Sequence, residues 1–525
     1  MSAGMLQDGG DARFAEVRRL IEEAGRAGLA LVVAGDGLRC RGNIGAVSEA
    51  LKARLWTLRD DVMRELSRPT FRIEERSSAP VRLPDYWLLW WSEMKVNPLL
   101  CNMHVVWHLR GAGCADRFRN ATARVAARHP LLNARLADYG NFLQIEFGDE
   151  YALDEVRVTE RPSCHSGFAD GAQALAEEMV WAPLWNGRIF RPFLVEVSPT
   201  EVLCGFVLHH LVSDLHAFQL VAEEVRHQIE FAAEALPEER RLQYSEYVRA
   251  MSQWEEGPGG RYRLAYWKIR LDRVPPVRLP AAPGAAAERL TPWHTVEFAI
   301  DGQLRARLAQ VAERSAATLA QVLLAAKFVA LAAMLRQADL VVTVIVSGRD
   351  HPLLLSFIGN LADCLPIRLH VDQSQSFRGL LERLRSSYVL DYRYRIKWEL
   401  IMNALAAVGT EIVAPTFNFV SVGDTPPEQG SNGPRGAGIS IERLETQRPP
   451  EQGSAKWYTS HEMNMFDTGR SIVGHVKYMP ARQCTSVVED FLQRFLCCLK
   501  RIAESPLFHV SQLTEPPTGM SSTPM

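Results

Sequence analysis

The stretch Val207-Leu208-His209-His210-Leu211-Val212-Ser213-Asp214-Leu215 decides the fold that the sequence predicts. An apolar run over residues 202–208 indicates a buried strand, which leads into two histidines, a short turn and an acidic residue. A helical pattern follows from His216 to about Ala233. Because neighbouring strand residues point to opposite faces of a sheet, only one histidine can face a given cavity, and one metal ion held by both is not expected. The histidine that faces the cavity is a candidate acid–base group, since an imidazole with its ordinary pKa of about 6.5 exchanges a proton near neutrality.

The composition is that of a globular protein with two or three domains. The chain has 525 residues, of which 47% are apolar and 23% are charged. A net charge of −2 argues against an obligate nucleic-acid binder. The first residues contain no apolar run that would form a signal peptide, and the most apolar segment, Val322 to Leu335, is too short to span a bilayer. Nine cysteines without a CxxC pair favour reduced thiols, so we expect a cytoplasmic protein without a zinc site and without membrane or nucleic-acid partners.

Residues 1–68 are predicted to form a small αββα module. Apolar residues at helical spacing over 14–24 indicate a first helix, and a second is expected from about 47 to 66. Between them, the run 29–33, the turn Gly35-Asp36-Gly37 and the return over 38–41 indicate a hairpin, whose second strand carries Arg39 and Arg41. Residues 69–84, which contain several prolines and charges, are predicted to be a linker.

The rest of the chain predicts two larger lobes of an α/β (α+β) protein. Strands alternate with helices, and the order favours antiparallel neighbours over a βαβ repeat. A segment rich in Pro, Ala and Gly over 275–292 is expected to cross between the lobes, which places the N-terminal lobe at 85–280 and the C-terminal lobe at 281–507. Residues 508–525 are expected to be disordered.

Six stretches in register carry a resemblance to a known family. They are Arg128-His129-Pro130, His209-His210-Leu211-Val212-Ser213-Asp214, Tyr266-Trp267, Ser347-Gly348-Arg349, Ile358-Gly359-Asn360 and Val473-Gly474-His475-Val476-Lys477-Tyr478. Over about residues 80–507 the chain resembles the condensation domains of nonribosomal peptide synthetases, within the chloramphenicol-acetyltransferase-like superfamily. The resemblance implies two lobes in a V with a central tunnel. It also implies an acyl thioester that a carrier protein delivers on its phosphopantetheine arm, and no bound cofactor or metal, because a thioester is already activated.

The resemblance assigns roles to residues of the motif. His210 matches the second histidine of the family motif and would be the catalytic group that meets the attacking hydroxyl or amine. His209 is expected to support the turn, and Asp214 is expected to be a structural acid. Arg349 is the expected partner of Asp214, because Asn133 stands where the family often has an arginine.

A second departure from the family pattern affects the tunnel. The family usually has glycine after the acid of the motif, and Leu215 stands there in this chain, which is expected to narrow or reshape the passage. Ser213, Asn418 and Ser421 are further candidates for the tunnel wall. Ser213 is not expected to be a nucleophile, because it lacks the GxSxG elbow of a hydrolase.

The N-terminal module resembles the β-hairpin docking domain of tubulysin-type synthetases. This resemblance implies that the hairpin edge with Arg39 and Arg41 adds the extended tail of a carrier-protein partner as a further strand. The alternative is a cap that only stabilises the fold.

No adenylation, carrier-protein or thioesterase segment is visible, so we expect a free-standing condensation enzyme that meets its donor in trans. The expected reaction transfers a polyketide or peptidyl chain to the hydroxyl of a separate small acceptor, which forms an ester and releases the chain. The chain is similar in this respect to chain-releasing condensation enzymes of polyketide synthases. The alternatives are amide formation with an amine, epimerisation of a carrier-bound residue, and a carrier-binding adaptor with a degenerate site. The identity of the acyl chain, the acceptor and the oligomeric state do not follow from the sequence.

Overall fold

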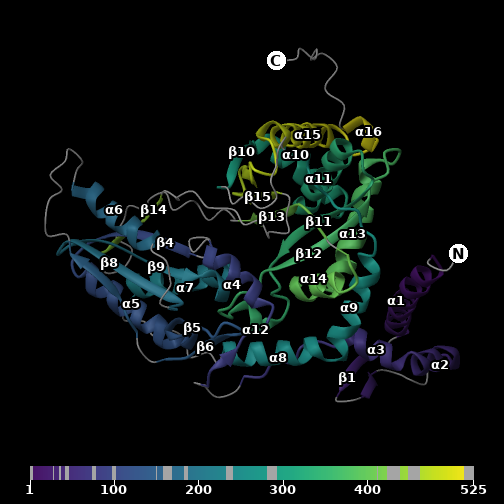
Figure 1. Ribbon diagram of the computed structural model, residues 1–525, viewed down its shortest axis with the longest axis horizontal. Coiled ribbons are helices and arrows are strands. Elements are labelled where there is room, and N and C mark those ends of the chain that lie inside the picture. Colours follow the sequence, from purple (N-terminus) through teal and green to yellow (C-terminus); the bar gives the residue numbers. More distant parts are fainter. Residues whose placement is uncertain are drawn as a thin grey trace, which may run out of the picture.

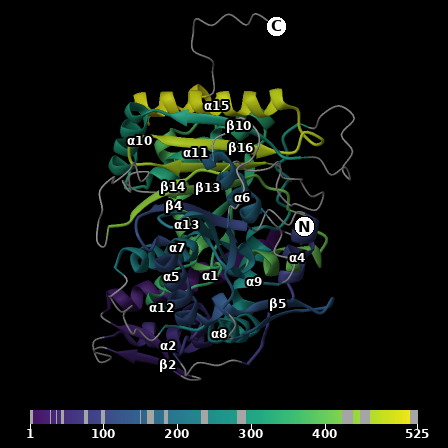
Figure 2. The same ribbon diagram turned by 90° about the vertical axis from the view of Figure 1, so that its left-hand side faces the viewer.

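The computed structural model describes residues 4–27, 29–34, 37–41, 47–73, 79–96, 102–148, 151–157, 168–181, 187–231, 241–280, 292–410, 412–421, 438–446 and 461–513. Figure 1 shows two lobes, each built on its own sheet, with helices α8 (Tyr244–Glu256) and α9 (Pro258–Arg270) running between them. The N-terminal module lies at the end of the molecule opposite α15 (Thr485–Glu504) in both views (Figures 1 and 2).

The N-terminal module contains three helices and a hairpin. Its elements are α1 (Gly4–Arg26), β1 (Ala30–Ala34), β2 (Gly37–Arg41), α2 (Glu49–Thr57) and α3 (Arg59–Leu66). The expected single helix over 47–66 is wrong, because Leu58 leaves the helical conformation and separates α2 from α3. Leu51, Leu55 and Val62 then pack with α1 in one small core. The residues of the expected turn, Gly35 and Asp36, lie outside the described part of the chain.

The N-terminal lobe is organised around a five-stranded sheet with the order β14-β4-β9-β8-β7. Its elements are α4 (Trp87–Val96), β4 (Asn102–Arg110), α5 (Cys114–Arg128), β7 (Asp154–Arg157), α6 (Phe168–Trp181), β8 (Phe190–Ser198), β9 (Glu201–His209) and α7 (Leu215–Glu230). A second sheet joins β3 (Val81–Arg82), β6 (Leu143–Glu146) and β5 (Arg135–Asp138). Strand β9 lies in the middle of the main sheet with antiparallel neighbours on both sides, and its residues from Val202 to His209 are buried. The end of β9 is therefore held rigidly.

The C-terminal lobe is organised around a six-stranded mixed sheet with the order β10-β16-β15-β13-β11-β12. Its strands are β10 (His294–Ile300), β11 (Asp339–Val346), β12 (Asp363–His370), β13 (Thr416–Ser421), β15 (Glu462–Asp467) and β16 (Ile472–Tyr478). The helices are α10 (Gly302–Arg314), α11 (Leu319–Leu335), α12 (Pro352–Leu355), α13 (Phe377–Arg393), α14 (Trp398–Ala406), α15 and α16 (Val510–Leu513). Helix α11 is apolar on all sides and is buried over most of its length, as expected for a central core helix.

The division between the lobes does not follow the expected boundary at residue 280. Residues of α9 and the chain after it, including Tyr266, Trp267 and Leu279, are buried in the core of the C-terminal lobe. Conversely, Leu354, Phe357 and other residues of the segment 354–361 are buried in the core of the N-terminal lobe. Strand β14 (Ser440–Leu444) also crosses, because it pairs with β4 at the edge of the N-terminal sheet. These crossings depend on contacts between distant segments, which local sequence patterns do not report.

Two segments that were expected to be loose are packed. In the expected linker, Phe71 stacks on the ring of Tyr247 at 5.9 Å, and Val81 and Arg82 pair with β6. In the expected disordered tail, Val510 and Leu513 are fully buried, so the fold extends at least to residue 513. Residues 514–525 lie outside the described part.

Candidate functional site

His210 follows the last residue of β9 and opens a single turn of 3-10 helix, His210–Val212, that leads to α7. Its Nδ1 lies 2.6 Å from the carbonyl oxygen of Ser213. A carbonyl oxygen can only accept, so Nδ1 carries the proton and donates it, and Nε2 of the neutral ring is left with a free lone pair. The His210 side chain is half-buried, unlike its buried neighbours His209 and Leu211. In the neutral ring, Nε2 of His210 is therefore the atom that can accept a proton.

His209 has the opposite character. Its Nδ1 accepts a hydrogen bond from the backbone N–H of Leu211 at 3.1 Å, and its ring lies 6.0 Å from that of Trp91. Burial, and then the nearby His210, lower the pKa of His209 to about 4. The ring is therefore neutral at physiological pH and serves to shape the turn.

Asp214 caps α7 and is paired with Arg349. Its Oδ1 accepts from the backbone N–H of Ala217 at 2.8 Å and from Nη2 of Arg349 at 2.7 Å. Its Oδ2 accepts from the backbone N–H of Leu361 at 3.0 Å. With three donors the carboxylate is well satisfied, although its side chain is only 5% exposed. Asp214 thus joins the turn 210–214 to a segment more than a hundred residues later in the chain.

Arg349 extends this junction with further hydrogen bonds. Nη1 donates to the carbonyl oxygens of Leu354 and Phe357 at 2.6 and 2.9 Å, and Nη2 donates to that of Gly359 at 3.1 Å. The residue before it, Gly348, has φ +65°, and a Cβ there would lie 2.4 Å from the carbonyl oxygen of Leu361. Only glycine fits this close approach, which brings the backbone at Gly348 against that at Leu361, the two ends of the segment 348–361.

Asn360 is a site residue that sequence reasoning did not single out. Its Nδ2 donates to the carbonyl oxygen of His210 at 2.8 Å. The stretch Ile358-Gly359-Asn360 belongs to the family pattern, but nothing in the sequence assigns a contact to Asn360. Asn133, the other departure noted in the sequence, donates instead to the carbonyl oxygen of Ala126 at 3.0 Å.

The four candidates for the tunnel wall do not form one group. Ser213 is fully buried and its hydroxyl donates to the carbonyl oxygen of Asp214, so the expectation that its side chain lines an open passage is wrong. Leu215 is the first residue of α7 and is 38% exposed. Asn418 and Ser421 lie on β13, where Nδ2 of Asn418 donates to Asn464 on the neighbouring strand and Ser421 is exposed.

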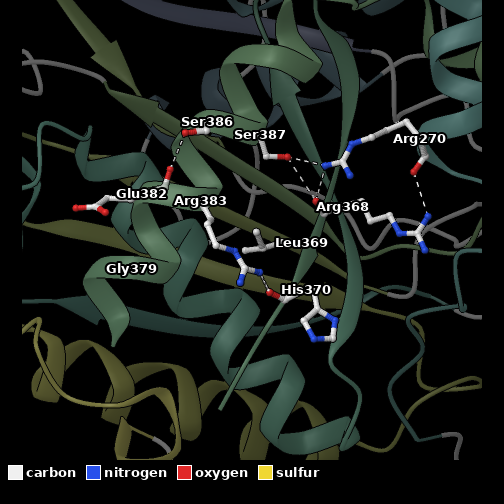
Figure 3. A pocket seen from close by; sticks show the side chains of 9 residues that line it. All are labelled: Arg270, Arg368, Leu369, His370, Gly379, Glu382, Arg383, Ser386 and Ser387. Atoms are coloured by element: carbon white, nitrogen blue, oxygen red, sulfur yellow. Dashed lines mark hydrogen bonds between the residues drawn. The ribbon is translucent and has the colours of Figure 1, made fainter. Parts of the chain in front are cut away.

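Two cavities in the described chain lie apart from His210. One, of about 460 Å³, is a shallow hollow beside β12 and α13 (Figure 3). Its three arginines, Arg270, Arg368 and Arg383, each donate to another residue of its wall, as the dashed lines in Figure 3 show. The other, of about 220 Å³, lies between the segment 68–71, α8 and the chain around 348–363 and 393–397. Neither has His210 in its lining.

The hairpin of the N-terminal module has the form that the sequence predicts. Strands β1 and β2 pair antiparallel from Ala30 with Arg41 to Ala34 with Gly37. Arg39 is exposed on β2, and Arg41 is the last residue of that strand. Within the described ranges, no cluster of His, Cys, Asp or Glu residues has the arrangement of a metal site. Among the helices described, no single one has the length and apolar character needed to cross a membrane, and α10 with α11 meets that test only as a pair bent by 100°.

Comparison with known proteins identifies the family. The model of the condensation domain family matches residues 88–520. Two proteins of the linear gramicidin synthase of Brevibacillus parabrevis are similar in sequence. One is 22% identical over 442 residues, which is 83% of this chain and 9% of that protein, and the other is 29% identical over 246 residues, 46% of this chain and 5% of that protein. The chain thus spans less than a tenth of the length of these curated relatives.

Solved structures share the fold over nearly the whole chain. A structure described as the basis for condensation-domain-mediated chain release from the enacyloxin polyketide synthase aligns with 97% of this chain and 98% of its own, with a TM-score of 0.66 and 19% identity. The EpoB cyclization-docking bidomain from Sorangium cellulosum aligns with 94% of this chain and 99% of its own, with a TM-score of 0.63 and 15% identity. With most of its length matched by the family model, the chain belongs to the condensation domain family, whose members transfer acyl groups that carrier proteins hold as phosphopantetheine thioesters.

Proposed function

We propose that this protein transfers a carrier-bound polyketide or peptidyl chain to the hydroxyl of a separate small acceptor, which forms an ester and releases the chain. The observation that carries the proposal is the orientation of His210. Its Nδ1–H donates a hydrogen bond to the carbonyl oxygen of Ser213, so Nε2 of the half-buried ring is the proton acceptor. An imidazole positioned in this way can contribute about 10²–10⁴-fold as a general base.

The proposed step moves one proton and exchanges one bond. Nε2 of His210 takes the proton of the acceptor hydroxyl while the oxygen attacks the thioester carbonyl. The tetrahedral intermediate then collapses, the C–S bond breaks, and the thiol of the carrier arm receives the proton from the imidazolium. The Ser213 carbonyl accepts from Nδ1–H throughout and stabilises the positive charge of the imidazolium in between.

The preference for a hydroxyl acceptor rests on what the base is needed for. An alcohol is a weak nucleophile and gains much from deprotonation, whereas a neutral amine can attack with positioning alone. Supporting this preference, a solved structure with the same fold is described as mediating chain release from a polyketide synthase. Amide formation is the alternative for the same site. An adaptor without turnover and an epimerase that needs no acceptor are the others.

The test is to mix the protein with an acyl-carrier thioester and a panel of alcohols and amines, and to read the carrier and the product by intact-mass spectrometry. We expect ester formation that His210→Ala slows by about 10²–10⁴-fold. The replacement His216→Ala is the matched control, since His216 lies on the first turn of α7, is exposed, and binds only the Leu355 carbonyl. Amides as the sole products would refute the ester proposal. Unchanged turnover in His210→Ala would refute the assigned base.

We further propose that residues 1–68 dock the carrier-protein partner. Among the described residues, strand β2 pairs only with β1 in a two-stranded sheet, so its other edge can offer backbone N–H and C=O groups to a partner strand. Exposed Arg39 adds a positive charge there, which suits an acidic tail. A structure that aligns with 94% of this chain is described as a cyclization-docking bidomain, which supports the proposal for the module.

A further inference from the structure

The cavity of about 220 Å³ lies where the chain leaving the N-terminal module meets both lobes. Its walls come from residues 68–71, α8, α9, the segment 348–363 and residues 393–397. No residue of the turn 209–214 lines it, but Gly348 and Leu361 do, and they flank the contacts that hold Asp214. The cavity is therefore separate from the turn 209–214 but shares Leu361 with the contacts of Asp214.

The lining of this cavity carries more positive than negative charge. The cations are Arg68, Arg263, Arg393, Arg395 and Lys397, and the carboxylates are Asp350 and Asp363. Three of the cations have acidic partners: Arg393 pairs with Glu65, Arg395 with Asp350, and Lys397 with Asp363. Arg68 and Arg263 make no ion pair of their own among the described residues, and the nearby Glu65 carboxylate, which acts on both, is already paired with Arg393.

Arg263 is a buried cation that donates hydrogen bonds to neutral carbonyl oxygens of described residues. It is 2% exposed, and its donors reach the carbonyl oxygens of Gly259 at 3.2 Å, Ser67 at 3.1 Å and Arg64 at 3.4 Å. Its guanidinium also lies over the ring of Trp254 at 4.8 Å. Burial, and then the neighbouring Arg68, lower the pKa of Arg263 to about 10. A buried charge is normally compensated by an opposite charge, and the Glu65 carboxylate near Arg263 is shared with Arg393, so the excess of positive charge in the lining favours an anion in the cavity.

Arg68 also lines this cavity, and like Arg263 it donates to backbone carbonyl oxygens. It is exposed, and it donates to the carbonyl oxygens of Glu65 and Ser67 at 3.0 and 2.9 Å. The two neighbouring guanidinium groups thus donate to carbonyl oxygens, and the carboxylate nearest to both, that of Glu65, forms its ion pair with Arg393. Planar, bidentate binding of a carboxylate is the interaction for which arginine is best suited.

Part of the cavity lining is apolar and aromatic. Phe71, Tyr247, Met251, Leu354 and Ile396 line it, and Phe71 packs edge-on against His351 at 5.2 Å. At about 30 Å³ for each water, the volume corresponds to roughly seven waters, which is room for one ring with a small substituent. We propose that this cavity binds a small organic anion, an apolar ring that bears one carboxylate, with Arg68 and Arg263 as its charge partners.

The test uses the full-length protein, and it is independent of the proposed acyl transfer because it reads binding without turnover. Isothermal titration calorimetry is carried out with benzoate, with its uncharged analogue benzamide, and with inorganic phosphate. We expect saturable benzoate binding at one site, with a dissociation constant on the order of 1 mM for so small a ligand. Benzamide and phosphate should each bind at least about tenfold more weakly, because each lacks one of the two features that the cavity matches.

Variants locate the binding. Arg68→Gln should weaken benzoate binding at least about fivefold, and Arg263→Gln should weaken it further. Arg383→Gln, which removes a cation from the larger cavity of Figure 3, is the matched control and should leave the affinity unchanged. If Arg263→Gln fails to fold, Arg68→Gln decides alone. The proposal is overturned if benzoate does not saturate, if benzamide or phosphate binds as well, or if Arg68→Gln binds like the unaltered protein.

Discussion

Replacing Arg349 by methionine should loosen the turn that carries His210. The two charged side chains of its pair with Asp214 are 3% and 5% exposed, and their closest atoms are 2.7 Å apart. Removing one partner of a buried pair typically costs about 3–5 kcal/mol, because the other charge is left buried without compensation. The carbonyl oxygens of Leu354, Phe357 and Gly359 lose their donor in the same change. A loss of about 4 kcal/mol in local stability corresponds to roughly 10³-fold faster opening at equilibrium.

Amide hydrogen exchange is the suitable assay, because a chain with two lobes is not expected to unfold in one two-state step. The backbone N–H groups of Leu361 and Ala217 both donate to Asp214, so peptides that contain them report on the pair directly. We expect their exchange in Arg349→Met to accelerate towards 10³-fold, and Asp214→Asn combined with Arg349→Met to recover part of the protection. The control is Arg494→Met, which removes a half-exposed pair with Asp490 and should change little. Exchange within about threefold of the unaltered protein at both peptides would show that the pair does not hold the turn.

Three further predictions concern stability and docking. Burial lowers the pKa of the fully buried Lys327 well below its ordinary value, so the folded chain holds this proton less tightly than the unfolded chain does. Lys327→Met should therefore raise the melting temperature at pH 7, and the gain should shrink as the pH approaches 10. The pKa of about 4 for His209 predicts that the free energy of unfolding falls by about 3 kcal/mol as the pH drops from 6.5 to 4, because over this range only the unfolded chain protonates His209. Acid titration of His209→Asn should lack this loss. Arg39→Glu, or deletion of residues 1–68, should weaken binding of the cognate carrier protein when the carrier concentration and the salt concentration are low. Turnover at saturating donor should be kept. Equal rates of the variant and the unaltered protein at low donor concentration would contradict the docking proposal.

The strand and turn of the motif could be predicted because their signals are local. The apolar run before His209 and the helical spacing after Asp214 lie next to each other in the sequence, and both elements form almost where the pattern places them. The expectation that only one histidine faces a given cavity rested on alternation within a strand, but β9 ends at His209 and His210 lies in the following 3-10 turn. His209 is buried and His210 is half-buried. The contact of Arg349 with Asp214 needed the family pattern, because no local signal joins residues so far apart.

The features that sequence reasoning missed arise from tertiary contacts. Leu58 stands in a run with good helical spacing, and only packing of the small module separates α2 from α3 there. Strand β14 was not predicted from the sequence, and it joins the sheet of the other lobe. Ser213 was a candidate for the tunnel wall, yet its neighbours cover it completely. In each case the outcome depends on contacts with segments far away in the sequence.

The segment 348–361 couples the position of the turn 210–214 to that of the C-terminal lobe. Asn360 holds the carbonyl oxygen of His210, while Arg349 and Leu361 hold Asp214, so both ends of the turn are fixed by one stretch. That stretch connects β11 to β12, the edge pair of the C-terminal sheet, although its middle is buried in the core of the N-terminal lobe. A shift of β12 relative to β9 must therefore either break these hydrogen bonds or move the histidine. The same stretch lines the cavity of about 220 Å³, so the anion proposed there would move the turn 210–214 only by binding one position of this stretch more tightly than another.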